Sequence, residues 1–531
     1  MFEAAEVEQT IAKDDFKREV ATLREQLLDA QGELRHADFP VIIVVGGVDG
    51  AGKGETVNTL LEWLDPRFVQ TVALGAPTDE ELERPRMWRF WRALPARGRI
   101  AIFHGGWHSE PIVDRVYRRI STGEMERQLA DVVAFERLLV EDGTLLVKLW
   151  MHLSKDRQRK RLKALAKDKE TRWRVTATDW EHFDMYDRFK KVSSTALRKT
   201  STGDAPWTIV GATDRRFQLL SVGRTLLDRL RAQLAARKTI VASEAGRGMI
   251  VASDPGRGAT VASEPGRGMT VASDASRSPT TAPATPVSGA SPPGARTIVS
   301  SLDLAQSVDA RTYDDRLERA QGELNEVCRH AARKGIATAI VMEGVDAAGK
   351  GGAIRRFTGA LDARMYRVVP IAAPTEEERA HPYLWRFWRA VPGRGRITLF
   401  DRSWYGRVLV ERVEGFCQPA DWQRAYAEIN DFEDQLVRFG VVVVKFWLHI
   451  SQDEQLKRFR EREQTPWKRF KITAEDWRNR DKWPDYERAV NEMIERTSSE
   501  VAPWTLVESE DKRFARLKVL ETVRAAIEAA L

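Results

Sequence analysis

The sequence predicts an α/β protein made of two tandem domains, each a doubly wound parallel β-sheet, and three observations carry this prediction. Apolar runs of strand length alternate with helical patterns along the chain, which indicates βαβ units. A glycine-rich turn at 343–352 follows one such run and precedes a helical pattern. The whole pattern occurs twice, with a segment of unlike composition between the copies.

The glycine-rich stretch reads Glu-Gly-Val-Asp-Ala-Ala-Gly-Lys-Gly-Gly and follows the apolar run 337–342. Glycines such as Gly344 and Gly349 let backbone N–H groups converge on an anion, Lys350 adds a point charge, and the helix N-terminus adds its dipole. The spacing is that of a P-loop; a glycine-rich turn without a ligand is the alternative. We therefore expect two P-loop kinase-like (thymidylate-kinase-like) domains with helical lids.

One position in this loop departs from the usual pattern. Gly351 stands where most P-loops place the Ser or Thr that holds Mg²⁺. A metal ligand must then come from another position, and Asp346, inside the loop, is a candidate.

The composition agrees with a globular protein that binds an anion. The chain has 531 residues, 42% hydrophobic and 31% charged, with a net charge of +7, which suits an anionic partner without naming it. Cys328 and Cys417 are too few for a disulfide framework. Neither a signal peptide nor an apolar run of membrane-spanning length is apparent. We expect a cytoplasmic protein with no membrane contact.

An internal repeat organises the chain. Adding 297 to a position in the first half gives its counterpart in the second, without a net gap from the P-loop to the last helix. Corresponding positions include Lys53 and Lys350, Lys148 and Lys445, Trp180 and Trp477, and the Trp-Arg-Phe-Trp runs at 88–91 and 385–388. A repeat of this length indicates two fused domains rather than a solenoid.

The repeat and the composition set the domain boundaries. We predict an N-terminal domain at 1–237, a linker at 238–301 and a C-terminal domain at 302–531. The linker begins with similar units of ten residues, such as the one opening with Val-Ala-Ser-Glu at 241–244, and then becomes rich in Pro, Ser, Thr and Ala. Such a composition cannot bury enough apolar surface to offset chain entropy, so we expect a disordered linker.

Strands and helices alternate in each domain. The N-terminal domain is expected to open with an amphipathic helix within 1–36 and a strand at 41–45. In the C-terminal domain we expect an opening helix, the cradle, four further strand segments and a last helix; the opening helix spans 302–334 and the strand segments span 366–371, 397–400, 441–448 and 504–507. The run at 441–448 is typical of a central parallel strand.

Polar residues follow the strand at 397–400. Asp401 comes directly after it, and Arg402 and Arg407 are close behind. Because the carboxyl ends of parallel strands face the crevice that also holds the P-loop, Asp401 is placed to hold Mg²⁺ or to orient the attacking phosphate. The arginines would neutralise charge on a transferring phosphoryl group; a surface ion pair is the alternative.

Two further stretches bear on the site. The segment 455–482 carries ten lysines and arginines, which predicts a lid that closes on phosphates, with a solvated helix face as the alternative. In 385–389 we expect the tryptophans to pack the domain and leave the role of the arginines open.

These motifs together resemble one family. The stretches 343–352, 384–386, 401–405 and 502–504 look like the second family of polyphosphate kinases, in its two-domain branch, over nearly the whole chain outside the linker. The resemblance implies Mg²⁺-dependent phosphoryl transfer from inorganic polyphosphate to a nucleotide, with AMP as the acceptor and ADP as the product in the fused branch.

The predicted site lies in the C-terminal domain. We predict Asp346, Lys350, Asp401 and Arg402 as catalytic, Gly344, Gly349, Gly351, Arg407, Lys468 and Arg469 as phosphate-binding, and Asp401 with Asp346 as the Mg²⁺ ligands. The four catalytic positions match the family's motifs, and the lid residues align less surely.

The N-terminal domain departs from this pattern. It keeps Asp49 and Lys53 in its own loop, but 104–106 reads His-Gly-Gly where the C-terminal domain has Asp-Arg-Ser, and Glu110 replaces Arg407. Loss of a metal-binding carboxylate and of charge neutralisers removes transition-state stabilisation. We therefore expect the N-terminal site to be degenerate and inactive or nearly so.

Alternative functions remain at this stage. An ATP-dependent nucleoside or nucleotide kinase would use the same fold, although Gly351 argues against it. A kinase that acts on nucleoside diphosphates and a non-enzymatic protein that binds polyphosphate or nucleic acid are further alternatives. We expect a homo-oligomer with no specific nucleic acid partner.

Overall fold

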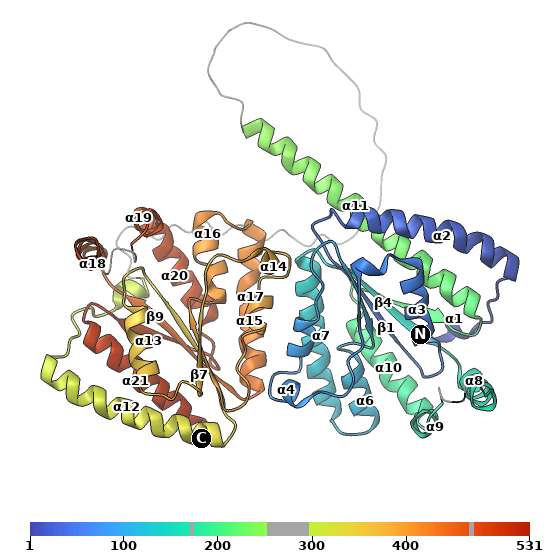
Figure 1. Ribbon diagram of the computed structural model, residues 1–531, viewed down its shortest axis with the longest axis horizontal. Coiled ribbons are helices and arrows are strands. Elements are labelled where there is room, and N and C mark those ends of the chain that lie inside the picture. The colour runs from blue at the N-terminus through green and yellow to red at the C-terminus, as the bar shows by residue number, and fades with distance from the viewer. Residues whose placement is uncertain (170–171, 173–174, 252–296, 467–471) are drawn as a thin grey trace, which may run out of the picture. The chain divides into compact units, whose positions relative to one another are not determined.

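The computed structural model describes residues 1–169, 172, 175–251, 297–466 and 472–531 (Figure 1). Met1–Leu234 and Ile298–Leu531 form one compact unit, and Ala235–Thr297 form a second. The first unit contains two five-stranded parallel sheets. The predicted α/β class is therefore confirmed.

The N-terminal half is built around a sheet with the strand order β2-β3-β1-β4-β5. Its strands are β1 (Val41–Gly47), β2 (Val69–Val72), β3 (Ile100–His104), β4 (Leu145–His152) and β5 (Trp207–Gly211). Its helices are α1 (Glu3–Glu6), α2 (Lys13–Leu34), α3 (Lys53–Trp63), η1 (Pro66–Phe68), α4 (Asp79–Leu82), α5 (Trp88–Arg92), α6 (Ser109–Val116), α7 (Thr122–Glu141), α8 (Lys155–Lys167), α9 (Ala177–Asp184), α10 (Tyr186–Thr200) and α11 (Arg215–Val251).

The C-terminal half repeats this topology, with the order β7-β8-β6-β9-β10. Its strands are β6 (Ala337–Gly344), β7 (Tyr366–Pro370), β8 (Ile397–Asp401), β9 (Val441–His449) and β10 (Trp504–Glu508). Its helices are η3 (Val299–Ser301), α12 (Ala310–Arg333), α13 (Lys350–Gly359), α14 (Glu376–Arg379), α15 (Trp385–Trp388), η4 (Trp404–Arg407), α16 (Val410–Glu414), α17 (Pro419–Arg438), α18 (Gln452–Gln464), α19 (Ala474–Asp481), α20 (Trp483–Thr497) and α21 (Lys512–Ala529).

Helices cover both faces of each sheet. In the C-terminal half, α12, α13 and α21 lie on one face, and α15, α17 and α20 lie on the other (Figure 1). Alternate residues of a strand point to opposite faces: in β6, Ile340 and Met342 pack in one core, while Ala339 and Val341 pack in the other. Burial on both faces explains why these strands read as continuous apolar runs.

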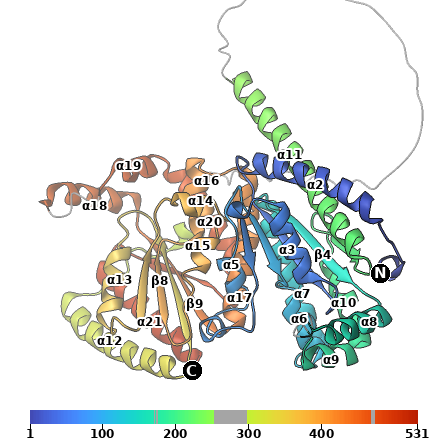
Figure 2. The same cartoon turned by 45° about the vertical axis from the view of Figure 1, so that its right-hand side comes forward.

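The lid helices α18 and α19 lie at the same end of the C-terminal half in both views (Figure 2). Arg458 of α18 donates to the carbonyl oxygens of Ala347 and Ala348 at 2.9 and 3.1 Å, which fixes α18 against the glycine-rich loop. Within the described ranges, no helix has the length and apolarity needed to span a bilayer. Cys328 and Cys417 are both free thiols.

The segment between the two halves differs from the predicted linker at both ends. Helix α11 continues to Val251, and η3 (Val299–Ser301) belongs to the first compact unit. Val299 is buried and donates its N–H to the Asn491 side chain at 3.1 Å, so tertiary contacts hold a segment whose composition predicts a tether. The rest of the predicted linker, residues 252–296, lies outside the described residues.

The two halves contact each other within the first unit. Trp91 of α5 stacks on Trp388 of α15, with ring centroids 5.7 Å apart, and the repeat offset relates these two residues. Arg438 forms a two-pronged ion pair with Asp131, at 2.8 and 3.1 Å. At Trp91 and Trp388, where equivalent residues meet, the contact resembles the self-complementary interface of a two-fold dimer.

A lysine lies in the middle of each long apolar strand. Lys445 of β9 is fully buried, and its Nζ lies 2.7 Å from Glu433 Oε2 and 2.7 Å from the Thr497 carbonyl oxygen. Lys148 of β4 makes the equivalent contact with Glu136 at 2.7 Å. The buried charge in each core is therefore paired and hydrogen-bonded, as a buried charge requires.

Glu433→Gln is expected to destabilise the protein by about 3–5 kcal/mol, because it leaves a buried ammonium group without its carboxylate. The measurement is the midpoint of urea unfolding, monitored by circular dichroism. The exposed pair between Arg524 and Glu528, at 2.7 Å, provides the control: Glu528→Gln should cost about 0.5 kcal/mol or less. Equal losses in the two variants would contradict a structural role for the buried pair.

Candidate active site

The phosphate cradle lies between β6 and α13. β6 ends at Gly344, and α13 begins at Lys350. A Cβ on Gly344 would lie 2.4 Å from the Leu448 carbonyl oxygen, and φ is +146° at Gly344 and +115° at Gly349. Both positions favour glycine because side chains rarely adopt these φ values. The loop can therefore present its backbone N–H groups to an anion at the N-terminus of α13.

Lys350 folds back over this loop. Its Nζ donates to the carbonyl oxygens of Gly344 and Val345 at 2.6 and 3.4 Å. Burial lowers the pKa of Lys350, although Asp346 opposes the shift. A Cβ on Gly351 would meet no atom within 4 Å. A Ser or Thr would therefore fit at this position. Packing does not explain why the hydroxyl group is missing here.

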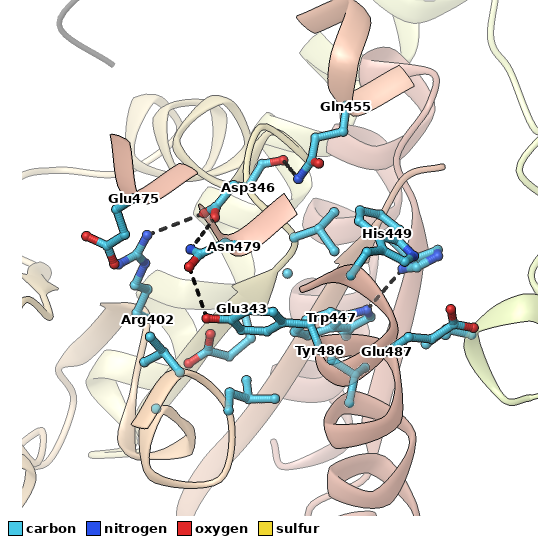
Figure 3. Close-up of a pocket in the computed structure, with 18 residues that line it drawn as sticks. Glu343, Asp346, Arg402, Trp447, His449, Gln455, Glu475, Asn479, Tyr486 and Glu487 are labelled. Atoms are coloured by element: carbon cyan, nitrogen blue, oxygen red, sulfur yellow. Dashed lines mark hydrogen bonds and ion pairs between the residues drawn. The ribbon is translucent and has the colours of Figure 1, made fainter. Parts of the chain in front are cut away.

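Asp401 and Arg402 lie at the carboxyl end of β8, beside the cradle. β8 pairs with β6 so that Asp401 is opposite Met342. Arg402 adopts a φ of +65°, a strained conformation for a residue with a side chain. Its Nη2 lies 3.4 Å from Asp346 Oδ1 (Figure 3). Burial alone would lower the pKa of Arg402, but attraction by Asp346 and Glu343 outweighs burial and raises it.

Asp346 connects the cradle to the lid. Asn479 of α19 donates to Asp346 Oδ2 at 2.9 Å, and the Gln455 side chain of α18 donates to the Asp346 carbonyl oxygen at 3.2 Å (Figure 3). Tyr486 of α20 donates to Asn479 Oδ1 at 3.1 Å. Our sequence reading missed Asn479. The sequence did offer one signal for Asn479: its repeat counterpart, His182, is also polar.

A buried pair lies behind Arg402. Ser403 donates to Glu343 Oε1 at 2.7 Å, and both side chains are buried. Burial raises the pKa of Glu343 above its usual value, although the Ser403 hydrogen bond opposes the shift. Sequence reasoning assigned no role to this pair, yet both partners are absent together from the N-terminal half, where Gly46 and Gly106 replace them.

One predicted phosphate ligand, Arg407, is not brought to this site. Arg407 pairs with Glu411 at 2.8 Å and lies over the Tyr383 ring at 4.4 Å, and it does not line the pocket beside Asp346. Its position near Arg402 in sequence does not reveal this, because the η4 turn redirects the chain. Lys468 and Arg469 lie outside the described residues.

A pocket opens between the cradle, the lid and α20. It has about 810 Å³ of empty space, open solvent included. Glu343, Asp346 and Arg402 line one end, and the other end is aromatic, with Trp447 and Trp483. Figure 3 shows Arg402 and Glu343 on one side of the pocket and His449 and Glu487 on the other. Arg402 and the adjacent cradle suit an anionic group, and the tryptophan rings suit a planar group.

The N-terminal half keeps the cradle and a pocket of about 740 Å³ of empty space beside it, and its own side chains pair with the loop residues. Lys53 Nζ donates to the Gly47 carbonyl oxygen at 2.8 Å and to Asp49 Oδ1 at 3.0 Å. His182 Nδ1 lies 2.7 Å from Asp49 Oδ2. Burial would raise the pKa of Asp49, but His182 and Lys53 outweigh it and hold the pKa well below its usual range. His104 stands at the end of β3, at the position of Asp401.

The C-terminal residues would suit a Mg²⁺ ion bound together with the substrate phosphates. Among the described residues, no group of three His, Cys, Asp or Glu side chains could hold a metal. Mg²⁺ needs only one or two carboxylates when substrate phosphates and water complete its octahedron, and Asp401 and Asp346 flank the cradle. The Asp346 carboxylate already accepts from Arg402 and Asn479, which leaves Asp401 as the better direct ligand.

This combination defines a class of protein. A central parallel strand leads into a glycine-rich phosphate cradle, the next strand ends in an Asp-Arg pair, and charged lid helices contact the cradle. Such an arrangement is that of a phosphotransferase with the nucleotide-kinase fold.

The chain belongs to the polyphosphate kinase 2 (PPK2) family. The family model matches residues 10–238 and 307–531, one match in each half. The chain is similar to the polyphosphate:AMP phosphotransferase of Pseudomonas aeruginosa, at 50% identity over 100% of this chain and 99% of that protein. It is 45% identical to the polyphosphate:AMP phosphotransferase of Pseudomonas syringae pv. tomato, with the same coverage. A crystal structure described as polyphosphate kinase 2 from P. aeruginosa superposes with a TM-score of 0.83 at 48% identity, covering 100% of this chain and 99% of that one.

Proposed function

We propose that the C-terminal half transfers the terminal phosphoryl group of inorganic polyphosphate to AMP and produces ADP. The names of the two full-length relatives support both substrates. One observation supports the assignment of this activity to the C-terminal half. Lys350, Asp346, Asp401 and Arg402 lie together at the ends of the adjacent strands β6 and β8, whereas the N-terminal half keeps only the counterparts of the first two.

The transfer requires little covalent chemistry from the protein. An oxygen of the AMP phosphate forms a bond to the terminal phosphorus of polyphosphate, and the bond from that phosphorus to the bridging oxygen breaks. The electron pair stays on the shortened polyphosphate. Catalysis therefore depends on alignment and on neutralising charge on the transferred group.

The described residues can supply both contributions. The cradle N–H groups and Lys350 bind phosphate oxygens, and Arg402 stabilises the developing negative charge. Asp346 holds Arg402 and the lid residue Asn479 at once. Lid closure would in this way be coupled to the position of the arginine.

Asp401 would hold Mg²⁺ beside the cradle, with Asp346 oriented toward the same site. A bound Mg²⁺ would supply positive charge that offsets part of the negative charge on the phosphate oxygens. The protein's own contribution is to fix the two carboxylates at the strand end and in the loop.

The test is an assay of the full chain with polyphosphate, Mg²⁺ and no ATP, supplied separately with AMP, ADP, GMP or GDP. We expect ADP from AMP as the fastest product, identified by chromatography. Turnover with ATP and a nucleoside but not with polyphosphate would overturn the donor. Faster use of ADP or GDP than of AMP would replace the proposed acceptor with a nucleoside diphosphate.

We also propose that the protein works in the cytoplasm, and its two free thiols support a reducing compartment. Assembly into a homo-oligomer stays a prediction, which light scattering of the purified chain tests.

A further inference from the structure

The internal repeat extends to a short segment that precedes each half. The offset of 297 relates Phe2 to Val299. Phe2 leads into α1, Val299 begins η3, and each is only 2% exposed. Both side chains are therefore buried in the core of the first unit.

In the N-terminal half, the leading segment packs against Trp150, which lines the pocket beside that half's cradle. The Phe2 ring stacks flat on His152, with centroids 4.3 Å apart and planes at 6°, and it also packs on Trp150. Glu6 Oε1 accepts from Lys190 Nζ at 2.6 Å and lies 2.9 Å from His152 Nε2. An aromatic ring and an ion-pair network thus contact His152.

The C-terminal half keeps the tryptophan and the histidine but has valine at the position of Phe2. Trp447 and His449, the counterparts of Trp150 and His152, line the pocket together with Val299. The counterparts of Glu6 and Lys190 are Asp303 and Glu487. Two carboxylates cannot form the ion pair that the other half has.

The position of His449 relative to the cradle indicates which part of the acceptor binds beside it. The phosphates of an acceptor must reach Arg402 and the cradle for transfer, so its nucleoside extends toward the other end of the pocket. Val299, Trp447, His449 and Trp483 all line the pocket, and His449 lies on the side opposite Arg402 (Figure 3), with the Trp483 ring 6.2 Å from it. Burial lowers the pKa of His449 to about 4, so its ring is neutral near pH 7 and suits stacking with a planar heterocycle.

We infer that the acceptor's planar base packs between His449 and Val299, and that the small side chain at position 299 is what admits it. The stacked Phe2 and His152 rings show how a flat ring occupies the equivalent place in the other half. Val299 is thus a specificity-determining residue supplied by the segment that leads into the C-terminal half. This inference rests on the proposed function, because it takes the acceptor to be a nucleotide.

Val299→Phe tests the inference, because it gives the C-terminal half the residue that the N-terminal half has at the equivalent position. We expect the KM for AMP to rise at least about 10-fold, a loss of about 1.4 kcal/mol of binding, while the KM for polyphosphate stays within about twofold. The reverse change, Phe2→Val, is the matched control and should leave both constants unchanged. Circular dichroism confirms that each variant is folded.

A second variant keeps the test decisive if Val299→Phe does not fold. His449→Ala removes the stacking face without adding volume, and it should also raise the KM for AMP at least about 10-fold. Binding of AMP alone, measured by quenching of tryptophan fluorescence, should weaken in parallel. An unchanged KM for AMP in folded Val299→Phe, or in His449→Ala where the first variant is unfolded, would overturn the inference.

The outcomes separate this inference from the proposed function. If the wild-type chain uses AMP but Val299→Phe leaves its KM unchanged, the base site is wrong and the proposed function stands. If the wild-type chain instead prefers another nucleotide, the proposed acceptor is wrong. A selective rise in the KM for that nucleotide in Val299→Phe would then still support the base site.

Discussion

Lys350→Ala is expected to lower kcat below about 0.1% of the wild-type value. Its ammonium group lies 2.6 Å from the Gly344 carbonyl oxygen, inside the loop that would wrap a phosphate. Removing it deletes a positive charge at the point where the transferred phosphoryl group gains negative charge. Steady-state turnover of AMP with polyphosphate measures the loss.

The repeat provides a matched control for this variant. Lys53 makes the equivalent contact with the Gly47 carbonyl oxygen at 2.8 Å, but it faces His104 and glycines instead of an Asp-Arg pair. Lys53→Ala should therefore leave kcat within about threefold of wild type. If it proves as damaging as Lys350→Ala in a chain that circular dichroism shows to be folded, then the N-terminal half holds a working site.

Asp401→Asn is expected to lower kcat at least about 10²-fold, because the amide keeps the shape of the side chain but removes the charge that would hold Mg²⁺. The same variant should need more Mg²⁺ for half-maximal rate. Both quantities follow from a titration of turnover against Mg²⁺ at saturating polyphosphate and AMP.

His104 stands at the equivalent strand end of the N-terminal half, so His104→Asn controls for a general effect of substitution at that place. It should change neither kcat nor the Mg²⁺ dependence. An Asp401→Asn enzyme with a near-normal rate and an unchanged Mg²⁺ requirement would show that the metal is held elsewhere.

The elements around the cradle were predictable because their signals are local. A buried strand, a glycine-rich turn and a helix start are neighbours in sequence, and hydrophobic periodicity places each of them. The opening helix of the C-terminal half was less predictable: the structure begins it at Ala310, whereas the sequence reading began it at Leu302. Its N-terminus depends on the Asp309 side chain, which accepts from the Arg311 and Thr312 N–H groups.

The remaining site residues were not predictable because they meet the cradle across long stretches of chain. Asn479 reaches Asp346 from 133 residues away, and Ser403 reaches Glu343 from 60. Nothing in the local pattern of a charged lid helix distinguishes a residue that faces the loop from one that faces solvent. Arg407 shows the converse. Its position in the sequence predicted that it would bind phosphate at the site, but it lies in the η4 turn and pairs with Glu411 instead.

The sequence by itself determined the α/β class, the duplication, the cradle, and the loss of the Asp-Arg pair from one half, because each is written in consecutive residues or in a constant offset between two copies. Only the tertiary structure decided which side chains share the pocket with the cradle, and that Phe2 stacks on His152 in one half whereas Val299 lines the pocket in the other. The physical reason is that such contacts depend on how helices pack across a sheet. Packing joins side chains whose separation along the chain carries no pattern.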